Sequence, residues 1–193
     1  FKSVTSEVND SDLKNNKKII NITVEEKATG EIFAGAGTGT SGSSLSGGIK
    51  ERNYLGKGIE LDTNLTLSDD QIKGKFSVIN PNFRNTDRSI NTTIESTATD
   101  YMTSSGYKTT RTGLKLGTGF EQYDDLFFKP FFSTNYETLE TNSAASSNLK
   151  KQEGSYFTSI FGYTFDLDKR NQRFQTTDGL RSKFVQHLPL VSE

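Results

Sequence analysis

The residues of this chain that could carry out chemistry are few, and predicted turns account for most of them. Asp69–Asp70 and Asp124–Asp125 are paired carboxylates, a residue type used for acid–base catalysis or Ca²⁺ binding. Both pairs fall between predicted strands, where Asp is common because its side chain hydrogen-bonds the local backbone. His187 is the only histidine, and the chain contains no cysteine and no G-x-S-x-G serine. We therefore expect no enzyme, no catalytic residue, no metal site and no cofactor.

A glycine-rich segment is the second candidate. Gly37–Gly42 satisfies G-x-G-x-x-G, but a strand is predicted to follow it, so no helix N-terminus is available to hold a pyrophosphate. The segment is therefore interpreted as a hairpin. Gly35, Gly37 and Gly39 share one face of the strand that leads into it. That arrangement indicates either a tight curl of a sheet or a weak strand edge that can open and pair with an incoming strand.

The elements that must position these residues are all predicted to be strands. Between Gly58 and Ser68 apolar residues alternate with polar ones, and three later segments repeat this period of two. No segment sustains a helical period. Turn-forming residues separate nine predicted strands, at residues 31–39, 44–53, 57–67, 71–79, 88–98, 108–120, 126–139, 155–167 and 179–188. The predicted fold class is all-β and antiparallel.

The composition favours one kind of all-β protein. Only 31% of the 193 residues are hydrophobic, the net charge is −1 and the mean hydropathy is −0.63. A soluble sandwich needs an apolar core between two sheets, whereas a transmembrane β-barrel is apolar only where it meets lipid. We therefore favour a transmembrane barrel with a polar lumen, and the near-neutral charge predicts no nucleic-acid partner. The charged residues expected to line the lumen are Lys50, Arg52, Glu60, Asp62, Lys73, Lys75, Glu95, Arg111 and Lys115.

The first 27 residues differ from the rest. Apolar residues alternate with polar ones over Ile19–Glu26, and Phe1–Val8 is a plausible partner strand across a polar loop at Asn9–Asn16. We interpret residues 1–27 as the last hairpin of a small soluble module and residues 28–193 as the barrel region. Because the chain starts at Phe1 and its only methionine is Met102, we expect it to be an internal fragment whose nine strands would not close alone into an even-numbered barrel.

Four short motifs follow one another along the chain, at residues 28–31, 48–58, 80–83 and 168–179. Together they resemble the BamA/TamA/two-partner-secretion transporter family of outer-membrane proteins. Residues 28–31 lead into the glycine-rich strand, and residues 48–58 follow it, as at the start of the family's barrel. Residues 80–83 are similar to its N/D-P-x-F turn, and residues 168–179 to its D-x-R…P-T-D-G hairpin, with Thr176 in place of the proline. The residues that carry these motifs are Asn53, Gly56, Gly58, Asn80, Pro81, Phe83, Asp168, Arg170, Asp178 and Gly179.

The resemblance implies that residues 1–27 end a POTRA module and that residues 28–193 form the first nine or so strands of a sixteen-stranded barrel. It implies an assembly factor that folds and inserts β-barrel proteins into the bacterial outer membrane, with the N-terminal segment in the periplasm. The implied partners are unfolded outer-membrane proteins, accessory assembly lipoproteins and outer-membrane lipid. A substrate strand would add to the first strand at a weak seam. The implied substrate-binding residues are Ile32, Phe33, Ala34, Gly35, Ala36, Gly37, Thr38 and Gly39.

Other functions stay open at this point. A TamA-like protein or a two-partner-secretion translocator belongs to the same family and would share these motifs. A passive porin is an alternative of a different class, although the predicted hairpin ahead of the barrel argues against it. A soluble β-sandwich binding protein is the third class, and partition into detergent would distinguish it from a barrel.

Overall fold

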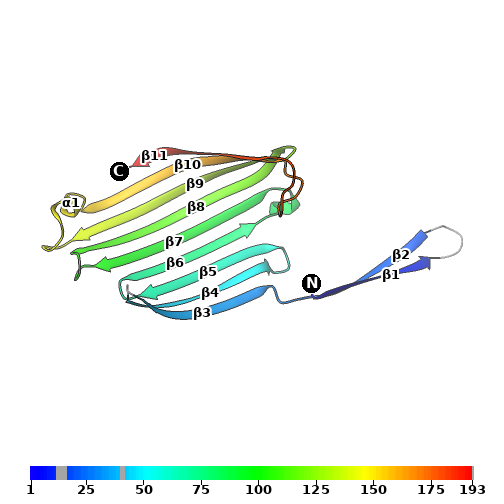
Figure 1. Ribbon diagram of the computed structural model, residues 1–193, viewed down its shortest axis with the longest axis horizontal. Coiled ribbons are helices and arrows are strands. Elements are labelled where there is room, and N and C mark those ends of the chain that lie inside the picture. Colours follow the sequence, from blue (N-terminus) through cyan, green and yellow to red (C-terminus); the bar gives the residue numbers. More distant parts are fainter. Residues whose placement is uncertain (12–16, 40–41, 193) are drawn as a thin grey trace.

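A single antiparallel sheet dominates the computed structural model, which describes residues 1–11, 17–39 and 42–192. Its nine strands lie side by side in chain order, with β3 at one edge and β11 at the other (Figure 1). The strands are β3 (Gly30–Gly39), β4 (Gly42–Tyr54), β5 (Ile59–Ser68), β6 (Gln71–Asn80), β7 (Ser89–Tyr101), β8 (Tyr107–Tyr123), β9 (Leu126–Thr141), β10 (Gly154–Asp168) and β11 (Arg181–Ser192). All nine predicted strands are confirmed, with ends displaced by a few residues.

The register shows that the predicted alternation divides the sheet into two faces. Directly paired residues share a face, so one row runs Leu61, Val78, Thr92, Leu116 and Phe132 from β5 to β9. The neighbouring row on the opposite face runs Lys50, Asp62, Ser77, Thr93, Lys115 and Ser133 from β4 to β9. The face that carries the first row is called the outer face below, and the face that carries the second is called the inner face.

The sheet is one layer thick. Within the described residues Leu139 and Ala145 are the only buried hydrophobic side chains, whereas Leu65, Phe76 and Ile94 of the outer face are 47%, 43% and 46% exposed. No second sheet packs on this apolar face in the described part of the chain. The sandwich alternative is therefore wrong, and the low hydrophobic content corresponds to a sheet that is apolar on one side only.

Two of the sequence motifs form turns at the end of the sheet where β3 begins. In the β4–β5 turn Gly58 donates its N–H to Asn53 Oδ1 (2.7 Å), and Gly56 and Gly58 have φ of +70° and +66°, where glycine is favoured. In the β6–β7 turn Pro81 follows the last residue of β6, and Phe83 begins a short 3₁₀ helix (Phe83–Asn85). The Phe83 N–H donates to the Arg88 carbonyl (2.8 Å), which closes the turn.

The N-terminal hairpin forms a separate two-stranded sheet. It consists of β1 (Ser3–Ser11) and β2 (Lys17–Glu25), and Figure 1 shows it projecting from the end of the large sheet where β3 begins. Lys2 Nζ lies 2.7 Å from Glu25 Oε1, and this contact lowers the pKa of Glu25 below its usual value. The predicted loop at Asn9–Asn16 is shorter than expected because β1 continues to Ser11; residues 12–16 of that loop lie outside the described residues.

At the opposite end of the sheet, the segment predicted to be a long loop contains a helical turn, α1 (Ser147–Lys150). Ser146 caps it by accepting the Leu149 N–H on Oγ (3.3 Å). The Asn142 N–H donates to the Gly106 carbonyl (2.8 Å), so this loop is tied to the β7–β8 turn. A single turn is too short to show a helical period, which is why the sequence did not reveal it. Among the described residues no helix is long and apolar enough to cross a membrane.

Placing an arginine on either face tests the assignment of the two faces. Leu65→Arg puts a charge on the outer face and is expected to lower the free energy of unfolding in bilayers by about 2–4 kcal/mol. Asn64→Arg puts the same side chain on the inner face, and we expect a change below about 1 kcal/mol. Denaturant titration of the protein folded into lipid vesicles measures both. Equal losses for the two variants would contradict the assignment.

Candidate functional site

All eight predicted substrate-binding residues lie in β3, at one edge of the sheet. Every residue of β3 is exposed, and among the described strands β4 is its only hydrogen-bonded neighbour. The G-x-G-x-x-G motif spans the β3–β4 connection, and its Thr40 and Ser41 lie outside the described residues. The candidate site is therefore a strand edge, and its chemistry is that of backbone N–H and C=O groups.

The hydrogen-bond pattern decides which residues of β3 offer those groups. The Arg52 N–H donates to the Thr29 carbonyl (3.3 Å). Thr29 and Arg52, which come just before the first pair of the ladder, Gly30 and Glu51, are therefore a hydrogen-bonded pair. Hydrogen-bonded and non-hydrogen-bonded pairs alternate along an antiparallel ladder, and the β3–β4 register continues without a shift. Odd-numbered residues of β3 therefore bond to β4. Of the eight predicted substrate-binding residues, those that direct their N–H and C=O groups away from β4 are Ile32, Ala34, Ala36 and Thr38.

The odd-numbered residues after Phe33 leave the inner face of β3 bare. A Cβ atom added at Gly35 or Gly37 would lie 3.5 Å or 3.6 Å from the nearest serine oxygen, and one at Gly39 would meet nothing within 4 Å. None of the three has a positive φ. Neither crowding nor backbone conformation requires glycine here, so these residues act by removing side-chain packing and stiffness from the edge strand.

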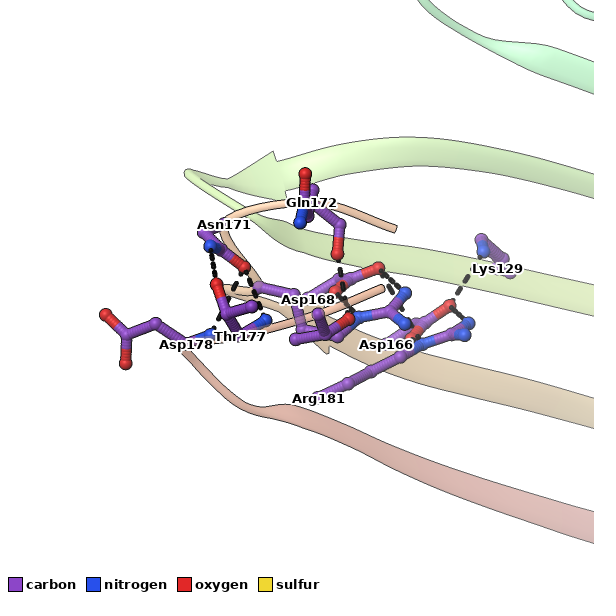
Figure 2. Close-up of polar contacts among 10 residues, drawn as sticks. Lys129, Asp166, Asp168, Asn171, Gln172, Thr177, Asp178 and Arg181 are labelled. Atoms are coloured by element: carbon purple, nitrogen blue, oxygen red, sulfur yellow. Dashed lines mark hydrogen bonds and ion pairs between the residues drawn. The ribbon is translucent and has the colours of Figure 1, made fainter. Parts of the chain in front are cut away.

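A second group of predicted residues lies at the start of β11, where a network of charges joins β9, β10 and β11. Figure 2 shows Lys129 and Arg181 directed at Asp166. Arg181 donates to both carboxylate oxygens of Asp166 (2.9 and 2.8 Å), Lys129 donates to Oδ2 (3.1 Å), and the Asp166 side chain is only 5% exposed. Arg170 forms a two-point ion pair with Asp168 (2.6 and 2.7 Å), which raises the pKa of the Arg170 guanidinium further.

The D-x-R…T-D-G hairpin is held in shape by its own side chains. Asn171 Oδ1 accepts the N–H groups of Thr177 and Asp178 at 3.3 Å, as Figure 2 shows. Gly179 has φ of +93°, and a Cβ atom there would collide with the backbone of Lys169, so only glycine fits. Thr176, which replaces the family's proline, donates its hydroxyl to the Gln172 carbonyl (2.8 Å). The motif residues are therefore structural.

Sequence reasoning missed Asp166, Lys129 and Arg181 as a unit. They lie on three different strands, so only the register brings them together. Their shared inner-face parity was the one available signal. His187, the single histidine, lies on the inner face with its ring against Phe131 (5.4 Å between centroids). No group of three or more metal-ligating side chains occurs among the described residues.

The inner face also forms an open polar cavity of about 470 Å³ across β7, β8 and β9. Its charged lining residues are Glu95, Arg111, Lys115 and Glu137. Lys73 pairs with Glu95 at 3.2 Å, and both side chains are 45% exposed. The cavity can hold water or a polar segment of chain.

A family model described as the Omp85 superfamily domain matches residues 53–191. The chain belongs to the Omp85 superfamily. The Omp85 match covers β5 to β11, and it confirms the family that the sequence motifs indicated. It also makes the sheet part of a bacterial outer-membrane β-barrel, whose outer face meets lipid and whose inner face is the lumen.

A solved structure of a relative has the same fold. "The crystal structure of BamA from Haemophilus ducreyi lacking POTRA domains 1-3" is similar over 96% of this chain, with a TM-score of 0.65 and 22% sequence identity. This Omp85 chain spans 39% of the length of that chain. At this level of identity the likeness shows the fold, and the nine-stranded sheet corresponds to part of that barrel.

Removing the Asp166 carboxylate tests its role in joining three strands. Asp166→Asn leaves Lys129 without its carboxylate and Arg181 with only the longer contact to Asp168 (3.9 Å), and we expect a loss of about 1–3 kcal/mol because charges in a half-buried site lose their compensation. Asp62→Asn is the matched control, since Asp62 lies on the same face and makes no ion pair among the described residues; it should change stability by less than about 0.5 kcal/mol. Denaturant titration in vesicles measures both, and equal effects would contradict this role.

Proposed function

We propose that this Omp85 chain is part of an assembly factor that folds and inserts β-barrel proteins into the outer membrane. The observation that carries the proposal is the edge of β3, where Ile32, Ala34, Ala36 and Thr38 direct four N–H and four C=O groups away from β4. Unpaired backbone groups are costly in lipid, so such an edge favours any strand that can pair with it.

The composition of the edge fits many different incoming strands. Main-chain hydrogen bonds supply affinity in strand addition, whereas side-chain pockets supply specificity. On the inner face of β3 the three glycines provide no pocket, and on the outer face Ala34 and Ala36 are small. An incoming strand would therefore be recognised by its extended backbone, which suits unfolded outer-membrane proteins of varied sequence as substrates.

The remaining parts of the proposal concern the N-terminal hairpin. We assign β1 and β2 to the end of a POTRA module in the periplasm. On this assignment the end of the sheet where β3 begins lies at the periplasmic side of the membrane. The hairpin forms its own sheet next to the start of β3, so substrates or accessory lipoproteins held by such a module would be near the free edge. This chain itself would carry out no covalent chemistry.

Translocation through the lumen is the second candidate, as in a two-partner-secretion transporter of the same superfamily. The mixed-charge inner cavity of about 470 Å³ favours it, because a polar, wet surface lets an extended chain pass. The two functions use different parts of the molecule: assembly uses the edge of β3, and translocation uses the inner face of β7 to β9. The passive-porin alternative lies outside this superfamily.

A proline substitution can remove one outward N–H without touching the β3–β4 ladder. Ala36→Pro is expected to slow insertion of a substrate barrel by about two- to tenfold, since one net hydrogen bond is worth about 0.5–1.5 kcal/mol. Ala36→Val, which keeps the N–H, is the matched control and should insert substrate at the wild-type rate. The assay uses the complete purified protein in proteoliposomes and follows the folding of an added outer-membrane protein.

The neighbouring position separates this effect from general damage to β3. Gly37→Pro removes an N–H that bonds to β4, so it should weaken β3–β4 pairing, which Ala36→Pro should leave intact. Equal insertion rates for Ala36→Pro and Ala36→Val would contradict strand addition at this edge. If Ala36→Pro impaired secretion of a chain through the lumen as well, a role specific to the edge would also be contradicted.

A further inference from the structure

One aromatic side chain lies across β3 and β4 on the inner face of the sheet. Phe33 of β3 is paired directly with Gly48 of β4. A Cβ atom added at Gly48 would lie 2.6 and 2.7 Å from Cζ and Cε1 of the Phe33 ring, closer than real Cβ contacts come. The ring therefore occupies the space that a side chain at position 48 would fill. We call this space the Gly48 notch.

Besides Phe33, the ion pair of Glu31 with Arg52 (3.1 Å) crosses between β3 and β4 on the inner face, but both side chains are exposed, so it specifies the register only weakly. Beyond Phe33 the paired inner-face residues are Gly35 with Ser46, Gly37 with Ser44, and Gly39 with Gly42. These pairs have almost no side chains to interlock. On the outer face the paired residues are Ile32 with Ile49, Ala34 with Gly47, and Ala36 with Leu45. After a slip of two residues in either direction, two of these three residues of β3 would still lie opposite a glycine or an apolar residue. Register is weakly specified in glycine-rich strands of this kind.

We propose that Phe33 fixes the register of β3 on β4 by occupying the Gly48 notch. A slip of one residue is excluded because it would turn every side chain of β3 to the opposite face. A slip of two residues would place Phe33 opposite Ser46 or Lys50, where a side chain fills the corresponding space. Among the positions within two residues of the observed pairing, Gly48 is the one inner-face residue of β4 where the ring fits without displacing a side chain.

The register matters for function because it sets where the free edge lies. A slip of two residues moves β3 along β4 by about 7 Å, since each strand residue rises about 3.4 Å. The same four residues would still face outwards, but the groups they offer would shift in depth relative to the membrane. Phe33 is in this sense a positioning residue for an incoming strand. The consequence for strand addition rests on the proposed function, whereas the register itself does not.

A second arrangement of this kind on the inner face supplies a control. Phe131 of β9 is paired with Gly162 of β10, and a Cβ atom at Gly162 would meet the Phe131 ring. The β9–β10 pairing is also fixed by large side chains, including the stacked rings of Phe128 and Phe165 (4.8 Å between centroids). Phe131→Ala should therefore weaken packing without changing any register.

Disulfide formation reads the β3–β4 register directly, because the natural chain has no cysteine. Ile32 and Ile49 form a non-hydrogen-bonded pair, whose Cα separation of about 4.5 Å suits a disulfide. Cysteines at 32 and 49 report the observed register, and cysteines at 32 and 47 report a slip of two residues. Yields of the two crosslinks are compared in the complete protein folded in its membrane, with and without substitutions at Phe33.

Phe33→Ala is expected to lower the ratio of the 32–49 to the 32–47 crosslink by at least about threefold. Phe33→Tyr keeps the ring and should keep the wild-type ratio, as should Phe131→Ala. Ser46→Gly opens a second notch two residues away and should raise the 32–47 crosslink while Phe33 is present. A smaller change in Phe33→Ala, or an equal change in Phe131→Ala, would overturn the proposal.

A crosslink from residue 36 to an added substrate strand separates this inference from the proposed function. If the wild-type protein captures a strand at residue 36, Phe33→Ala should move the capture point on that strand by two residues and Phe33→Tyr should restore it. Absence of capture in every variant would overturn strand addition and leave the register result standing. Capture at an unchanged point in Phe33→Ala, despite a shifted 32–47 crosslink, would overturn the positioning role.

Discussion

The structure depends on one constraint, which is that backbone N–H and C=O groups in a membrane need hydrogen-bond partners from the protein itself. Seven strands of the sheet, from β4 to β10, satisfy it by pairing on both sides. Because every strand is paired in chain order, the single layer needs no core, and the sequence supplies apolar residues to the lipid face alone. Among the described strands, β3 and β11 each have one neighbour, so each carries backbone groups along one edge that no described strand pairs.

The two edges of the sheet differ in how far side chains reinforce the backbone pairing. Near the β11 edge, the Asp166 carboxylate binds the charged groups of Lys129 from β9 and Arg181 from β11. Aromatic rings such as Phe128 and Phe165 stack on the outer face. Side chains there reinforce the backbone ladder. At the β3 edge few side chains reinforce the ladder: among the described residues, Phe33 on Gly48 and the ion pair of Glu31 with Arg52 (3.1 Å) are the inner-face contacts that cross between β3 and β4. Side chains therefore hold β11 to its neighbour more firmly than they hold β3 to β4.

Much of the fold could be predicted from the sequence because its period of two is strict. The strand predicted at residues 57–67 is β5 at Ile59–Ser68, and the predicted lumen residues Lys50 and Asp62 do lie side by side on the inner face. The motif turns could be predicted as well, because positions such as Gly179 need a backbone conformation that favours glycine.

The rest could not be predicted, because it depends on which residues face each other across strands. Asp166 and Lys129 are 37 residues apart in the chain, and only the β9–β10 register makes them neighbours. The hydrogen bond from Arg52 to Thr29 shows which residues of β3 bond to β4 and which face outwards. Nothing in the types of these residues indicates where that bond lies. The contact of Phe33 with Gly48 likewise needs the pairing of 33 with 48.

Amide hydrogen exchange at single-residue resolution in β3 tests the central claim most directly. In the complete protein in bilayers, the amides of Phe33, Gly35 and Gly37 should be protected and those of Ala34 and Ala36 should exchange rapidly. Addition of a substrate strand should then protect Ala34 and Ala36 without altering the other three. Equal protection of all five amides before substrate is added, with no change afterwards, would show that the edge is already permanently paired and would contradict the account.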